Sequence, residues 1–199
     1  MRFLPSILVI LLSFTAFMMT IGRRGADARP AKQRIAIETG EGLKMSIRTT
    51  APENSNSLRI HITFENVSDD DALLNLGMML ANGKTLVPDA IRLVLNGPDG
   101  QSRELKFHNT RVAGRIDDYI VPLRAGSAYT IKLSLKEYWC PETKESYLRL
   151  NSGRYELRAK FIGKGARHVN SDTEGLGLIH FWTGKLNSDV AMFEIVEQD

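Results

Sequence analysis

The chain has 199 residues, with one cysteine and 26 basic against 23 acidic residues. Residues 1–28 hold three of the basic residues and one acidic residue, so the remainder carries 23 basic and 22 acidic residues. This balance, without a basic stripe with interleaved aromatic residues, argues against a nucleic-acid-binding protein. A single cysteine excludes an intramolecular disulfide, so a hydrophobic core must hold the fold together.

The chain begins with the pattern of an export signal. Arg2 precedes an apolar run over residues 3–21, and Ala26-Asp27-Ala28 has the small-x-small pattern that signal peptidase recognises. We therefore predict a signal peptide over residues 1–28 and a secreted or periplasmic location. Basic residues also follow the apolar run, and positive charge tends to stay on the cytoplasmic side of a membrane. An uncleaved anchor formed by residues 3–22 is therefore the alternative.

After the leader, residues 29–40 have no sustained pattern and are expected to form a flexible arm. From residue 41 onward, apolar and polar side chains alternate, which places every second side chain in a core. Stretches of this kind occupy residues 43–47, 58–64, 91–95, 105–107, 129–135, 155–161 and 191–195. Short strands at this spacing, without a convincing helix, predict a single all-β domain over residues 41–199, built from two packed antiparallel sheets.

One segment lacks this alternation. Residues Leu73–Leu80 are almost all apolar, and periodicity alone does not separate a fully buried strand from a helical turn here. We favour a strand that ends in a loop over residues 81–84.

The sequence Asn151-Ser152-Gly153-Arg154-Tyr155-Glu156-Leu157 resembles the D-x-G-x-Y-x-C stretch of immunoglobulin-like domains. Gly153 and Tyr155 match that stretch, Asn151 stands for the Asp, and Leu157 replaces the cysteine. In that family the tyrosine bonds back to the main chain a few residues upstream. The resemblance implies an Ig-like antiparallel β-sandwich.

Three further stretches are similar to bacterial secreted Ig-like domains, including those near the intracellular proteinase inhibitor family. They are Leu58–Asp70, Val121–Ser127 and Trp182-Thr183-Gly184. An Ig-like sandwich needs only about 100 residues, so we expect long loop insertions. They are placed at residues 66–90, 108–118, 136–150 and 163–187. Within the last, the apolar run 175–182 is interpreted as an extra strand or as an exposed patch for a partner.

The sequence contains no convincing metal, cofactor or catalytic motif. No histidine lies three or four residues from another histidine or from Cys140, so no local metal-ligand pattern exists. Asp117 and Asp118 are adjacent, so on a strand they point to opposite faces and do not form a dyad. Cys140 precedes Pro141 and charged residues, which indicates a partly covered thiol in an exposed loop. The alternative is an intermolecular disulfide or a reactive thiol.

We therefore expect a non-catalytic interaction module with a protein or cell-envelope partner. The candidate contact residues are Trp139, Cys140, Arg167, His180 and Trp182, because tryptophan often anchors interfaces and long loops carry binding.

Two other classes stay open. An enzyme or an enzyme's accessory domain would draw its site from the 163–187 connector, with His168, Asp172, Glu174 and His180 as its source. The other class is a protease-inhibitor-like or structural envelope protein. Protease inhibition is suggested by the family resemblance alone.

Overall fold

The computed structural model describes residues 41–50, 58–80, 83–108, 115–143, 148–166 and 180–196. All of them belong to one compact unit, Arg34–Asp199. The predicted signal peptide, the predicted arm over residues 29–40 and most of the 163–187 connector lie outside the described residues.

Nearly all of the regular secondary structure in the described residues is β-strand, which confirms the all-β prediction. The strands are β1 (Leu43–Thr49), β2 (Arg59–Asn66), β3 (Ala72–Leu80), β4 (Thr85–Val87), β5 (Ile91–Asn96), β6 (Ser102–Phe107), β7 (Ile116–Leu123), β8 (Ala128–Ser134), β9 (Tyr138–Trp139), β10 (Gly153–Gly163), β11 (His180–Phe181) and β12 (Gly184–Ile195). One turn of 3-10 helix, η1 (Leu135–Glu137), follows β8. Within these ranges, no helix has the length and apolar character needed to cross a bilayer.

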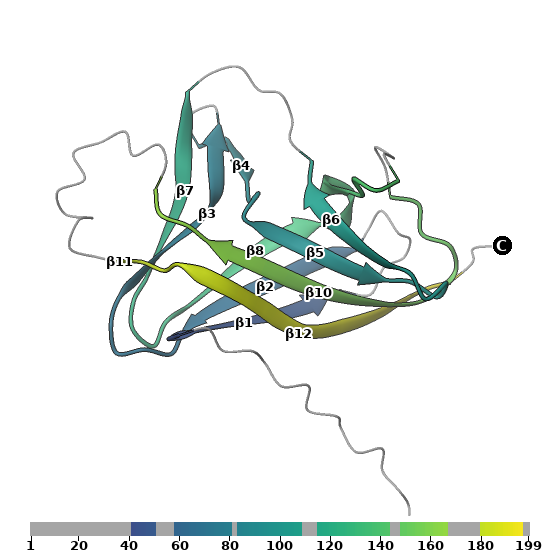
Figure 1. Cartoon of the computed structure of the whole chain (residues 1–199), viewed down its shortest axis with the longest axis horizontal. Coiled ribbons are helices and arrows are strands. Elements are labelled where there is room, and N and C mark those ends of the chain that lie inside the picture. Colours follow the sequence, from purple (N-terminus) through teal and green to yellow (C-terminus); the bar gives the residue numbers. More distant parts are fainter. Residues whose placement is uncertain are drawn as a thin grey trace, which may run out of the picture. The chain divides into compact units, whose positions relative to one another are not determined.

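The strands form three sheets, which are visible in Figure 1. The β2 sheet has the order β1-β2-β8, and the β10 sheet has the order β12-β10-β5-β6-β9. In the third, the β3 sheet, β7 pairs along β3, while β4 and β11 pair with opposite ends of β3. All pairings are antiparallel except the short one between β11 and β3. The antiparallel pairing agrees with the predicted all-β class, whereas the prediction of two sheets omitted the β3 sheet, which forms from the 66–90 insertion together with β7 and β11.

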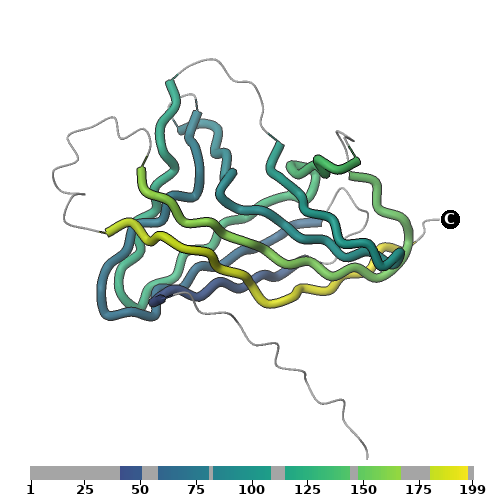
Figure 2. Tube along the Cα trace, viewed as in Figure 1, coloured from purple at the N-terminus to yellow at the C-terminus, as the bar shows by residue number. Residues whose placement is uncertain are grey.

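The β2 and β10 sheets share one hydrophobic core, and alternation along each strand supplies it. Phe64 on β2 and Phe161 on β10 are fully buried, and their rings meet edge to face with centroids 5.0 Å apart. Edge-to-face contact is a favoured geometry because the positive ring edge meets the negative ring face. At the side of this core, β1 and β12 run next to each other, purple and yellow in Figure 2.

The prediction for Leu73–Leu80 is confirmed, because β3 is a strand with successive buried residues. It carries a bulge between Asn75 and Gly77. The boundary of the 108–118 insertion is wrong, because β7 already begins at Ile116. Pro122 lies within β7 opposite Leu73, and among the described strands β7 pairs only with β3. A proline is tolerated there because an edge strand leaves one row of N–H groups unpaired.

Asn66, at the end of β2, holds the following turn by its side chain. Its amide nitrogen donates to the carbonyl oxygens of Asp70 at 2.8 Å and Leu123 at 3.0 Å. Its amide oxygen accepts from the Ser68 main-chain N–H at 3.1 Å and from the Ser68 hydroxyl. Asn66 is 1% exposed, so this asparagine serves packing and turn formation.

Candidate functional site

Trp182, a predicted contact residue, is half-buried and packs against other parts of the domain. Its ring stacks on Phe161 with centroids 5.6 Å apart, and its indole N–H donates to the carbonyl oxygen of Glu41 at 2.9 Å. Gly163 and Gly184 let the ring lie close, since a Cβ at Gly163 would come within 2.4 Å of it. The ring therefore has a structural role, with only part of its surface open to a partner.

The expectation that Cys140 lies in an exposed loop is wrong. Cys140 follows β9 directly and is 1% exposed, as a member of the hydrophobic core. The short pairing of Trp139 with Lys106 on β6 draws this segment onto the β10 sheet. In this position the Cys140 thiol is covered, which argues against an intermolecular disulfide or a reactive thiol. Trp139 is half-buried.

The remaining sequence-predicted residues are not brought together in the described part of the chain. His180 is exposed and pairs with Ala72 through the short strand β11. Arg167 lies outside the described residues, as do His168, Asp172 and Glu174 of the enzyme alternative. Among the described residues, no group of three His, Cys, Asp or Glu side chains is placed to hold a metal ion.

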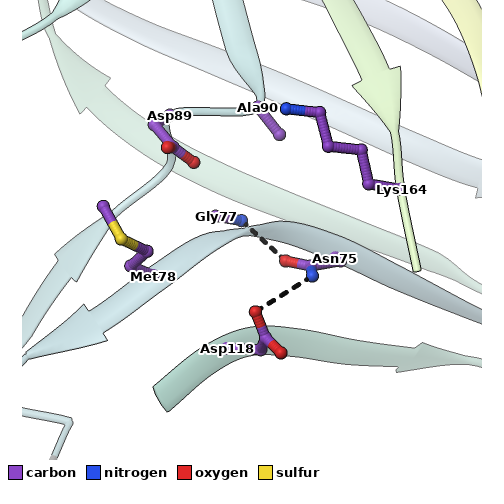
Figure 3. Close-up of a pocket in the computed structure, with 7 residues that line it drawn as sticks. All are labelled: Asn75, Gly77, Met78, Asp89, Ala90, Asp118 and Lys164. Atoms are coloured by element: carbon purple, nitrogen blue, oxygen red, sulfur yellow. Dashed lines mark hydrogen bonds between the residues drawn. The ribbon is translucent and has the colours of Figure 1, made fainter. Parts of the chain in front are cut away.

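A polar pocket lies where β3, β7 and the end of β10 meet (Figure 3). The Asn75 amide nitrogen donates to Asp118 Oδ1 at 3.2 Å and to the Gly165 carbonyl oxygen at 3.0 Å. Its amide oxygen accepts the Gly77 main-chain N–H at 3.1 Å. Asn75 and Asp118 are each 5% exposed. Asp117, the neighbour of Asp118, instead forms a 2.9 Å ion pair with Arg115.

The size of this pocket limits its chemistry. Its volume is about 40 Å³, and a water molecule takes up about 30 Å³ of the liquid. Asp89 and Lys164 complete the polar lining. The pocket therefore has room for a water molecule or a small ion. Its bonds join β3 to β7 and to the segment that follows β10.

The strongest candidate for recognition is a group of basic side chains on the outer face of the β2 sheet. Arg48 on β1 lies directly across from His61 on β2, and His61 lies directly across from Lys132 on β8. Arg59, two residues before His61, projects from the same face, because side chains alternate along a strand. Arg48, Arg59 and Lys132 are exposed, and His61 is half-buried. We call these four residues the basic strip.

Side chains directly opposite each other on antiparallel strands are close neighbours, and like charges in that position are destabilising. The ion pairs found among the described residues do not include any member of the basic strip. Arg48, Arg59 and Lys132 therefore place positive charge on one face, and none of them has an ion-pair partner among the described residues. Sequence inspection missed the basic strip because the three strands are paired only in the fold.

The outer face of the β10 sheet provides a contrast. Arg92 and Lys160 also lie directly across from each other, but Glu104 accepts a hydrogen bond from Arg92 at 2.9 Å and forms an ion pair with Lys160 at 3.9 Å. An open hollow of about 310 Å³ lies beside these three residues. Because Glu104 offsets one of these two positive charges, this face has a smaller unbalanced charge at its centre.

No protein-family model matches the chain, and no curated protein matches it. The site must therefore be interpreted from its own geometry and charge.

Proposed function

We propose that this protein is an exported, non-catalytic Ig-like interaction module that binds an anionic partner through the basic strip. The observation that carries the proposal is the in-register row Arg48, His61 and Lys132. A sheet whose other face is buried in the core presents these side chains from a rigid support, which lowers the cost of ordering them on binding.

The order of the strands supports the Ig-like part of the proposal. Ig sheets contain strands A, B and E on one side and G, F, C and C′ on the other. The β1-β2-β8 order is equivalent to A-B-E, and the β12-β10-β5-β6 order is equivalent to G-F-C-C′. On this assignment, β3 and β4 are an insertion between strands B and C, and β7 occupies the place of strand D in chain order.

The start of β10 supports the same assignment. The Tyr155 hydroxyl donates to the Asn151 carbonyl oxygen at 2.9 Å, which is the bond of the tyrosine corner at the start of strand F. Leu157, in the place of the usual cysteine, is fully buried. In this domain, apolar packing at Leu157 takes the place of the inter-sheet disulfide.

Charge supports the choice of an anionic partner. Unbalanced positive side chains on one face attract anions and increase the rate of encounter, and salt screens this attraction. Export is supported by the leader over residues 1–28, with its apolar run and its Ala26-Asp27-Ala28 site. A location outside the cytoplasm agrees with a module that recognises a protein or an envelope component.

The test uses dextran sulfate, a polyanion without a peptide main chain, and measures its binding to the purified protein by titration calorimetry. The double variant Arg48→Gln/Lys132→Gln should bind at least about tenfold more weakly, because two charges are lost from the strip. The control Arg92→Gln/Lys160→Gln removes the same charge from the β10 sheet and should retain most of the affinity. Equal losses in both variants, or no binding by the unaltered protein, would overturn the proposal.

A further inference from the structure

The outer edge of β8 lacks a strand partner in the described part of the chain. β8 pairs with β2 along its whole length, from Ala128 to Ser134. In an Ig sheet of the order A-B-E-D, strand D would cover the other edge of strand E. Here β7, which precedes β8, pairs with β3 instead, so the edge of β8 stays uncovered by it.

The hydrogen bonds at the two ends of β8 determine which main-chain groups face this open edge. Leu135 N–H donates to the Leu58 carbonyl oxygen, and Asn66 N–H donates to the Ser127 carbonyl oxygen. Hydrogen-bonded pairs alternate along antiparallel strands, so the odd-numbered residues of β8 bond to β2. The N–H and C=O groups of Ala128, Thr130 and Lys132 therefore point outward, where a further strand could bond to them.

Exposure agrees with this assignment. Ala128, Thr130 and Lys132 are all exposed. The next outward N–H, that of Ser134, donates to the Glu137 carboxylate at 2.8 Å. The opposite edge of the sheet is closed in a similar way, since Ile47 N–H donates to Asp189 Oδ1 at 2.8 Å. Side chains therefore cap the β2 sheet at both of these places, whereas the outward main-chain groups of Thr130 and Lys132 have no hydrogen-bond partner in the described part of the chain.

We propose that an extended segment of the partner protein, with acidic and apolar residues in alternation, adds to the outer edge of β8 as a further strand. This inference rests on the proposed function and names the form in which the anionic partner is recognised. Main-chain groups of Thr130 and Lys132 would supply the hydrogen bonds, as in other cases of strand addition. Acidic side chains on the outer face would then lie beside Lys132, within the field of His61 and Arg48.

The inner face explains the apolar positions of such a segment. Ile131 and Leu133 on β8 are 6% and 5% exposed, whereas Ile60 and Ile62 on the central strand β2 are fully buried. A strand added beside β8 would place alternate apolar side chains next to this slightly open side of the core.

A second copy of this chain is a poorer occupant of the edge. If two β8 strands paired antiparallel, the Lys132 side chains of both copies would lie on the same face as both basic strips. Like charges at neighbouring positions oppose such pairing, and a lysine on an edge strand is a common protection against self-association. An acidic segment would instead be attracted by the positive side chains on this face.

The test uses the peptide acetyl-Glu-Val-Glu-Val-Glu-Val-Glu-amide, with binding measured by calorimetry. Thr130→Pro removes one outward N–H and leaves the bonds to β2 intact, because proline is tolerated on an edge strand. Thr130→Val is the matched control, since it also removes the hydroxyl that bonds to Thr63 at 2.8 Å but keeps the main-chain N–H. Circular dichroism establishes that both variants are folded.

We expect Thr130→Pro to weaken peptide binding at least about tenfold, with Thr130→Val close to the unaltered protein. A peptide with alternate N-methylated amides should lose binding to the same degree, since it keeps its charges but loses main-chain donors. Full binding by Thr130→Pro, or by the methylated peptide, overturns the strand addition. If dextran sulfate still binds in that case, the proposed function survives. A dimer that Thr130→Pro dissociates in sedimentation would assign the edge to a second copy and overturn the inference.

Discussion

The carboxylate of Asp189 accepts a hydrogen bond from the main-chain N–H of Ile47 at 2.8 Å. Asp189 lies on β12, at the edge of the β10 sheet, and Ile47 lies on β1, at the edge of the β2 sheet. One side chain therefore joins two sheet edges that share no strand pairing. Along the other edge of the β2 sheet, no described residue closes β8 in this way at Thr130 and Lys132, and this difference is the basis of the proposed binding mode.

This bond predicts a stability difference between two substitutions. Asp189→Ala should lower the free energy of unfolding by about 1–2 kcal/mol, because the Ile47 N–H loses its acceptor. Asp189→Asn keeps an amide oxygen at the same place and should lose less than half as much. Urea denaturation followed by circular dichroism measures both values. Equal losses would show that charge, and not the hydrogen bond, stabilises this edge.

Two tyrosine hydroxyls should respond differently to removal. Tyr155→Phe deletes the bond to Asn151 and should cost about 1 kcal/mol of unfolding free energy, while the ring keeps its stacking on Phe193. The Tyr138 hydroxyl is buried and has no hydrogen-bond partner among the described residues. Tyr138→Phe should therefore be neutral or stabilising. A larger loss in Tyr138→Phe than in Tyr155→Phe would contradict the assignment of the tyrosine corner.

The bulge in β3 requires glycine at residue 77. Gly77 has φ +144°, and a Cβ there would lie 2.2 Å from the Val87 carbonyl oxygen. Gly77→Ala should destabilise the fold by at least about 3 kcal/mol, since strain and a main-chain clash add together. Gly100→Ala is the control, because Gly100 also has positive φ (+71°) but open space around it. Thermal unfolding of the two variants checks the prediction, and similar midpoints would refute it.

Stability should fall in alkaline solution. Burial and the hydrogen bond with Tyr129 raise the pKa of Tyr119 well above its ordinary value of 10.0, and burial raises the pKa of Tyr138 in the same direction. The folded state therefore keeps both phenols protonated while the unfolded state ionises. Their contribution is complete below pH 10 and is lost as the pH rises from 10 toward the folded-state pKa values.

An ultraviolet titration measures this effect. Part of the tyrosinate absorbance should develop only together with unfolding, and Tyr138→Phe should reduce the steepness of the stability loss. If the full absorbance develops while circular dichroism remains native, these two phenols are accessible and the explanation fails.

Local alternation was sufficient to locate most of the strands. The predicted positions of Ile131 and Leu133 in the core are confirmed, because the pleat alone turns every second side chain to the same face. The exposure of Cys140 was predicted wrongly because its neighbours, the rigid Pro141 and the charged Glu142, are typical of an exposed loop. The burial of its thiol depends on β9 pairing with β6, and that contact joins segments distant in the chain.

The basic strip could not be derived from the chain order. Arg48, His61 and Lys132 each look like an ordinary solvent-facing residue of a separate strand, and only the register places them in one row. The same holds for the edge of β8. β7 does not cover the outward N–H groups of β8 because β7 pairs with β3. The local sequence of β8 does not encode that pairing.

The amino-acid sequence by itself determined that this domain is built from strands, and which face of each strand lies inside, because side-chain alternation is a local property of the pleated backbone. Tertiary structure alone decided which strands are neighbours, where charge accumulates on the β2 sheet and which edge stays open. Those properties depend on contacts between residues far apart in the chain, since register and pairing are set by packing of the whole core.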